Sequence, residues 1–256
     1  MAGRWEWVAD GPIQVGVTTS RREHTTSTVV VSGDGALLVD PAWDPDELGW
    51  IADDLAAAGV TVTAGFATHA HHDHLLWHPR WAGADRWASS GTRDQATVRR
   101  SDLVDALGSG WPAELGALVG RVNAASGSRL PWNGTSIELI THDGHACGHT
   151  ALWLPAAQVL IAGDMLSDVE LPLLEESDPA DYDAAMAALR PYVERARVII
   201  PGHGTPAIGP EAATARWVAD RRYLDALIAD RDQDDHRMVH PGMRDAHQHN
   251  RSRVLT

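Results

Sequence analysis

The stretch THAHHDHLLW, at residues 68–77, restricts the fold of this chain more than any other. It continues the apolar run VTAGFAT at 62–68, which has the length and character of a buried strand. Neutral imidazole binds metal ions through a ring nitrogen, and side chains two positions apart in extended backbone point the same way. The stretch therefore predicts a metal-binding group fixed at the end of a strand. Its candidate residues are His69, His71, Asp73 and His74.

Three further apolar runs end in polar residues of the same kinds. The run at 136–149 closes on DGHACGH, the run at 158–164 closes on Asp164, and the run at 197–204 places His203 in a tight turn between glycines. A strand end is a rigid place from which to present a ligand. These residues are therefore candidates for the same site as the first histidines.

The order of the elements predicts the fold class. Strands are expected at 13–17, 27–33, 35–40, 62–68, 85–90, 136–149, 150–155, 158–164 and 197–204, and helices at 44–59, 92–107, 179–194 and 211–230. Strands with a helix, followed by strands with helices, suit two packed sheets with helices outside. We expect a four-layer α/β arrangement in one domain spanning 1–230.

The last residues differ in character from the rest. Residues 231–256 are polar and carry four histidines, His236, His240, His247 and His249. We expect a solvated tail here. The alternative is that the tail packs on the domain, folds over the pocket and contributes a substrate contact.

Composition and charge exclude several functions. The 256 residues carry a net charge of −14, and every basic residue is arginine; a nucleic-acid binder needs a basic face. No run is long and apolar enough for a transmembrane helix, and the first residues lack the pattern of a signal peptide. The single cysteine, Cys147, fits a reducing compartment. We expect a cytoplasmic protein that acts on a small molecule.

Four motifs together resemble those of the metallo-β-lactamase superfamily. HAHHDH at 69–74 fits H-x-H-x-D-H, DGHACGH at 143–149 resembles G-H-x-x-G-H, and AGD at 162–164 and PGHG at 201–204 match the two motifs that follow. They stand in the family's order, and with the leading hairpin they span 27–204. The resemblance implies a four-layer αββα sandwich of the metallo-β-lactamase type.

The resemblance also implies a dinuclear metal site. His69, His71 and His145 would hold the first metal, Asp73, His74 and His203 the second, and Asp164 would bridge the two. Two Zn²⁺ ions suit this set, with iron or manganese as alternatives. His149 is expected to hydrogen-bond a ligand residue, His72 to be structural, and Cys147 to be a packing thiol.

Two adjacent cations would lower the pKa of a water between them and so generate a hydroxide nucleophile. Asp73 and Asp164 could orient it and shuttle its proton. We expect hydrolysis of an ester, lactone, thioester or amide. The carboxylate at Asp164 and the lack of a cysteine ligand favour the glyoxalase II and lactonase branches over zinc β-lactamases. The alternatives are a mononuclear iron dioxygenase, a biosynthetic cyclase or lyase, and a metal-binding scaffold without catalysis.

Tryptophans suggest where the substrate lies. The chain has 11 tryptophans against one phenylalanine and three tyrosines. An indole suits the wall of a ligand pocket because it pairs a large apolar face with one N–H donor. We expect an apolar pocket beside the metals, built for a small uncharged substrate and poorly suited to glutathione thioesters and penicillins. Its walls would come from Trp77, Trp81, Trp111 and Trp132.

Overall fold

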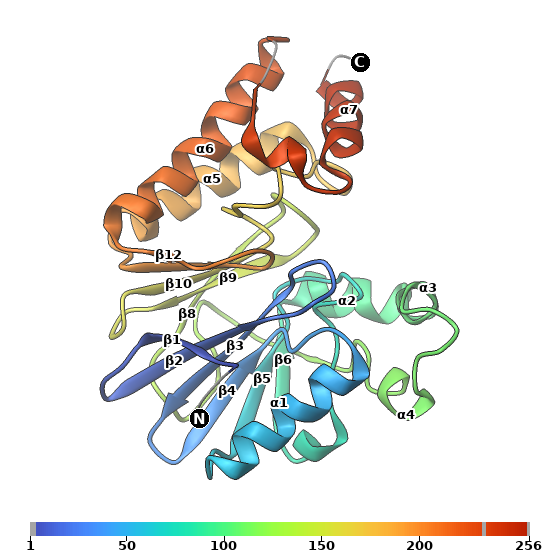
Figure 1. Ribbon diagram of the computed structural model, residues 1–256, viewed down its shortest axis with the longest axis vertical. Coiled ribbons are helices and arrows are strands. Elements are labelled where there is room, and N and C mark those ends of the chain that lie inside the picture. Colours follow the sequence, from blue (N-terminus) through green and yellow to red (C-terminus); the bar gives the residue numbers. More distant parts are fainter. Residues whose placement is uncertain (1–3, 232–233, 255–256) are drawn as a thin grey trace.

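The computed structural model describes residues 4–231 and 234–254, and its core is a pair of facing sheets (Figure 1). The first sheet runs in the order β1 (Glu6–Ala9), β2 (Ile13–Thr19), β3 (Thr26–Ser32), β4 (Gly35–Val39), β5 (Val62–Phe66), β6 (Asp85–Ala88) and β7 (Asn123–Ala124). The second runs in the order β12 (Ala207–Ile208), β11 (Val198–Pro201), β10 (Val159–Gly163), β9 (His149–Leu154) and β8 (Glu138–His142).

Helices cover the outer face of each sheet (Figure 1). The first sheet is covered by α1 (Pro45–Ala57), α2 (Ser90–Val98), α3 (Arg100–Ala106) and α4 (Ala113–Gly116), with a short 3₁₀ turn at Pro79–Trp81. The second is covered by α5 (Pro179–Val193), α6 (Pro210–Ile228) and α7 (Met243–Val254), with a 3₁₀ turn at His236–Val239. The predicted four-layer αββα sandwich is confirmed.

Alternation along β4 shows how the sequence builds these layers. Leu37 and Val39 lie in the apolar core between the sheets, whereas Leu38 packs outward in the cluster that includes Leu48 and Ile51 of α1. Successive side chains of a strand point to opposite faces. A continuous apolar strand is therefore the pattern of a sheet buried on both sides, and β9 and β10 are buried along their whole lengths.

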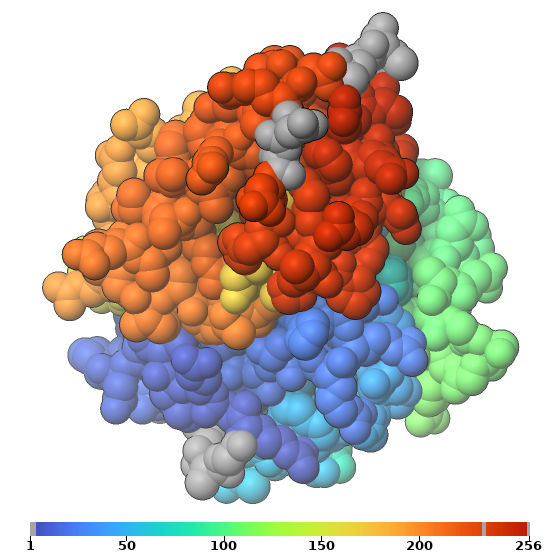
Figure 2. Space-filling model, turned by 45° about the horizontal axis from the view of Figure 1, so that its top comes forward, coloured from blue at the N-terminus to red at the C-terminus, as the bar shows by residue number. Residues whose placement is uncertain are grey.

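The structure differs from two expectations about the elements. The helix expected at 92–107 is two helices, because Arg99 leaves the helical region between α2 and α3. The solvated tail is also wrong for the described part of 231–256: Arg237 and Asn250 are fully buried, and Met243 joins the core beneath α5 and α6. Figure 2 shows this red segment lying against the orange surface of α6. Among the described residues, no helix combines the length and apolarity needed to cross a bilayer.

Candidate metal centre

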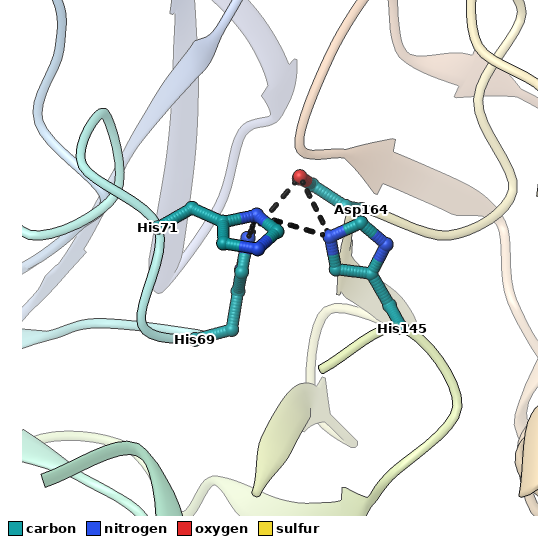
Figure 3. Close-up of side chains that lie close together, drawn as sticks. All are labelled: His69, His71, His145 and Asp164. Carbon is teal, nitrogen blue, oxygen red and sulfur yellow. Dashed lines mark hydrogen bonds and ion pairs between the residues drawn. The ribbon is translucent and has the colours of Figure 1, made fainter. Parts of the chain in front are cut away.

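Histidine and aspartate side chains from both sheets meet where strands of the two sheets end. His69 and His71 follow β5 of the first sheet, while His145 precedes β9 and Asp164 follows β10 of the second. Figure 3 shows these four side chains converging, His69 and His71 from one loop and His145 and Asp164 from two others. The centre therefore exists only when the two sheets are packed together.

Three ring nitrogens form a first group, termed the three-histidine group. The Nδ1 atom of His71 lies 2.9 Å from Nε2 of His69 and 3.2 Å from Nε2 of His145. His69 is fully buried and His145 nearly so. Three nitrogens thus face one small space.

A second group, termed the Asp-His-His group, lies beside the first. The Nε2 atom of His74 is 3.3 Å from Nε2 of His203 and 3.2 Å from Oδ2 of Asp73. The Nε2 atom of His203 is 3.4 Å from the same Asp73 oxygen. All three side chains are buried.

The carboxylate of Asp164 stands between the two groups. Its Oδ2 atom is 3.2 Å from Nε2 of His69 and 3.4 Å from Nε2 of His145. Its Oδ1 atom is 3.2 Å from Nε2 of His74, and Oδ2 is 3.4 Å from Nε2 of His203. One side chain therefore contacts nitrogens of both groups.

These distances fit metal coordination. Tetrahedral zinc with Zn–N bonds of about 2.0–2.1 Å places its ligand nitrogens roughly 3.3 Å apart, close to the separations within both groups. In the described part of the chain, Oδ1 of Asp164 is buried without accepting a hydrogen bond. A buried carboxylate oxygen needs a partner, and a cation held between the groups would supply it.

Hydrogen bonds on the far side of the rings fix which nitrogen faces the centre. Asp40 accepts from Nδ1 of His74 at 2.9 Å and from the amide of Thr68 at 2.9 Å. The Nδ1 atom of His203 donates to the carbonyl of Glu23 at 2.7 Å. Such contacts leave Nε2 free for a metal and orient the ring. Asp40 and Glu23 are not among the residues predicted from the sequence, although Asp40 ends the apolar run LLVD, the same signal that predicted Asp164.

Three more residues lie around the ligand set. His149 accepts the backbone N–H of Asp164 at 3.1 Å through Nε2. Glu176 lies 3.7 Å from Nε2 of His71 and pairs with Arg99. Glu170 lies 3.9 Å from Nδ1 of His203. Sequence reasoning missed both glutamates, because nothing local distinguishes them in an irregular segment.

Burial and nearby charge shift the pKa values of buried histidines in opposite directions in the two groups. Burial lowers the pKa of His145 to about 3 and that of His69 well below its usual value. Burial also opposes protonation of His74 and His203, but nearby carboxylates, Asp164 foremost, raise the pKa of both rings well above the usual value. His69 and His145 thus offer neutral lone pairs, whereas the Asp-His-His group attracts a positive charge.

The pocket-wall prediction is wrong for Trp77 and Trp81. The indole of Trp77 packs over Gly65 on the outer face of β5 and beside Arg86, and its Nε1 donates to the Trp81 carbonyl at 3.4 Å. The Trp81 ring lies 5.0 Å from it, in the same outer core. Ala64 faces the core between the sheets, so its neighbour Gly65 faces outward.

The other two predicted tryptophans do not reach the metal ligands either. Trp132 donates to Thr63 at 3.0 Å, at the opposite end of β5 from His69. Trp111 packs edge-on against Trp43, 5.8 Å away. Trp43 in turn lies 5.4 Å from the ring of His72, the residue that precedes Asp73. Cys147 is exposed.

Two packed sheets, covered by helices and carrying a buried cluster of histidine and aspartate at their strand ends, define a metal-binding αββα protein. The Metallo-beta-lactamase superfamily profile matches residues 21–203, and the chain belongs to that superfamily.

Two curated proteins of this kind are similar to the chain in sequence. Hydroxyacylglutathione hydrolase of Thermosynechococcus vestitus is 29% identical over 163 residues, which cover 64% of this chain and 56% of that protein. The hydroxyacylglutathione hydrolase of Synechococcus sp. is 28% identical over 156 residues, 60% of this chain and 55% of that protein. The chain therefore spans about half the length of the curated relatives it matches.

Solved structures show the same fold at low identity. The metallo-beta-lactamase from Pontibacter korlensis superposes with a TM-score of 0.61 at 17% identity, covering 84% of this chain and 98% of that chain. The inverting sec-alkylsulfatase Pisa1 from Pseudomonas sp. gives a TM-score of 0.66 at 17% identity, covering 84% of this chain and 41% of that chain. At such identities the likeness concerns the fold alone.

Proposed function

We propose that this protein is a hydrolase that works with two divalent metal ions, Zn²⁺ in the first instance. The observation that carries the proposal is the position of Asp164, whose carboxylate contacts nitrogens of both ligand groups. The three-histidine group would hold one ion, the Asp-His-His group the other, and Asp164 both. The family relationship and the hydrolases among its relatives support the same conclusion.

Metal ions bound here would polarise a carbonyl and acidify a water molecule. The protein's own carboxylates do the remaining work. Asp73 and Asp164 face the centre, where they can orient the attacking water and accept its proton. Thr25 donates to Oδ2 of Asp73 at 2.8 Å, which fixes that carboxylate. Water then adds to the carbonyl carbon, the acyl bond breaks, and the leaving group takes up a proton.

The charges around the centre favour an uncharged acyl substrate. Glu176 lies 3.7 Å from His71, and this neighbouring ring is the main cause that lowers the pKa of Glu176 to about 2. Arg99 is occupied by both oxygens of Glu176, and Arg22 stacks over Trp43 at 4.4 Å. An anionic substrate would meet a fixed carboxylate and find these guanidinium groups already engaged. A chain with a single cysteine cannot form an internal disulfide, and this fits the reducing environment of the cytoplasm.

The test is hydrolysis by the purified protein reconstituted with zinc, manganese or iron. We expect turnover of small neutral esters, lactones or thioesters, lost in Asp73→Ala. A neutral ester should show a higher kcat/KM than its carboxylate-bearing analogue, and equal values would reject the proposed charge preference. One iron per chain with oxygen consumption would instead identify a dioxygenase. Two metals without turnover of any carbonyl substrate would indicate a cyclase, a lyase or a scaffold.

A further inference from the structure

The segment from 165 to 178, termed here the flanking loop, joins Asp164 to α5 without forming a helix or strand. It is nevertheless largely buried, with Leu166, Ser167 and Leu174 inaccessible or nearly so. Buried backbone N–H and C=O groups need partners. The partners of this loop therefore show what holds it in place.

Those partners come from the C-terminal part of the chain. Nη1 of Arg237 donates to the carbonyls of Ser167 at 3.3 Å and Glu170 at 3.0 Å. Asp220 of α6 accepts the amide of Leu166 at 3.0 Å and also pairs with Arg237. The guanidinium of Arg237 and the carboxylate of Asp220 thus hold the loop in place by hydrogen bonds.

The charge of Arg237 is balanced where it lies. Its side chain is fully buried, and it pairs with Asp220 and with both oxygens of Asp235, at 3.0 and 2.9 Å. A planar guanidinium can donate to several acceptors in fixed directions, which an ammonium group cannot do. Arginine at this position can therefore hold two carboxylates and two backbone carbonyls together.

The same loop also binds the turn that carries His203. The hydroxyl of Ser167 donates to the His203 carbonyl at 2.8 Å and accepts the amides of Val169 and Glu170, both at 3.0 Å. Asp168 accepts the amide of Thr205 at 3.0 Å. The His203 turn and Arg237 thus both bind the same short segment, Ser167–Glu170.

We propose that Arg237 is a positioning residue for His203, acting through Ser167, and that it thereby sets the affinity of the Asp-His-His group for its metal. Among the described residues, Arg237 and Ser167 make no contact with His69, His71 or His145. The flanking loop approaches that group elsewhere, with Glu176 3.7 Å from His71 and Ser177 donating to the Gly144 carbonyl at 2.8 Å. Arg237 also lies beyond the stretch matched by the family profile, which ends at 203. This inference rests on the proposed two-metal function.

The experiment titrates zinc alone into the metal-free full-length protein, by calorimetry, in wild type, Ser167→Ala and Arg237→Lys. Ser167→Ala removes only the hydroxyl link, and Arg237→Lys keeps the charge facing Asp220 but loses the fork of donors. Both should weaken zinc binding at the Asp-His-His group by about 10- to 100-fold and leave the three-histidine group unchanged. His203→Ala identifies which binding event belongs to which group.

The matched control is Arg190→Gln, which breaks an exposed pair with Glu194 on α5 and should bind zinc as wild type does. Equal weakening of both zinc sites in Ser167→Ala, or no weakening in either variant, would overturn the inference.

A second readout needs no metal. Amide exchange in segment 201–205 of the metal-free protein should be faster in both variants, with segment 143–149 unchanged. Unaltered exchange at 201–205 overturns the inference, whereas a wild-type chain that binds a single zinc counts against the proposed function instead.

Discussion

Asp164 is the residue whose carboxylate contacts both ligand groups. Its two oxygens contact His69 and His145 on one side and His74 and His203 on the other. Asp164→Ala should therefore weaken both metals together, whereas Asp73→Ala should affect only the Asp-His-His group. Elemental analysis after dialysis measures this. A full complement of two metals in Asp164→Ala would show that the carboxylate is not shared.

The raised pKa values of His74 and His203 lead to a prediction about pH. In the metal-free protein, burial works against protonation, but Asp164 and the other carboxylates outweigh it and keep these rings protonated at neutral pH. A metal must displace those protons. Zinc affinity at the Asp-His-His group should therefore rise from about pH 6 to about pH 8 as competition by protons falls.

The three-histidine group provides the internal control for this experiment. Because burial lowers the pKa of His145 to about 3 and that of His69 well below its usual value, few protons compete at these two rings, and zinc affinity should change less over the same range. Calorimetry in buffers of different ionisation enthalpy counts the protons released at each group. Equal proton release at the two groups would contradict the assignment.

At the scale of elements, the turn after β11 is built around a glycine. A Cβ atom at Gly202 would collide with Oδ1 of Asp164. Gly202→Ala should therefore displace that carboxylate and reduce metal content without unfolding the protein, as followed by elemental analysis and circular dichroism. Gly49→Ala is the matched control, since its Cβ would meet open space on α1. Normal metal content in Gly202→Ala would mean that the backbone of the turn shifts and the Asp164 carboxylate keeps its position.

Helix α7 is attached to the flanking loop through Asn250. This buried amide accepts the N–H of Leu174 at 3.0 Å and donates to the carbonyl of Pro172 at 2.6 Å. Asn250→Ala would leave buried backbone groups without partners, at a cost of about 2–4 kcal/mol in the free energy of unfolding. Urea denaturation measures it, with exposed His249→Ala as the control. A change below about 0.5 kcal/mol would show that α7 contributes little to stability.

On the scale of the whole molecule, sequence patterns predicted the features that are set by local sequence, namely the strands and the ligand residues that follow them. His69–His74 and Asp164 follow apolar strands, and the strands formed where the apolar runs stand. The prediction of a tryptophan-lined pocket was wrong because proximity in sequence does not determine on which side of β5 an indole ring lies. Trp77 follows the histidines closely, yet it packs over the outward face of Gly65.

The prediction of a solvated C-terminal tail was wrong for a related reason. Average polarity predicts exposure, but Arg237 and Asn250 are polar residues whose partners lie on other elements and satisfy them in the interior. Asp40 escaped notice in the same way, since its partner His74 is 34 positions away. Contacts of this kind arise only when the two sheets have packed.

The packing of the two sheets creates a centre to which each contributes ligands, and the most direct measurement of that centre is a zinc titration of the metal-free protein. Calorimetry with elemental analysis should give two zinc ions per chain, one of them lost in His71→Ala and the other in His203→Ala. A single ion per chain, or none, or two ions that persist in either variant, would contradict the dinuclear centre proposed here.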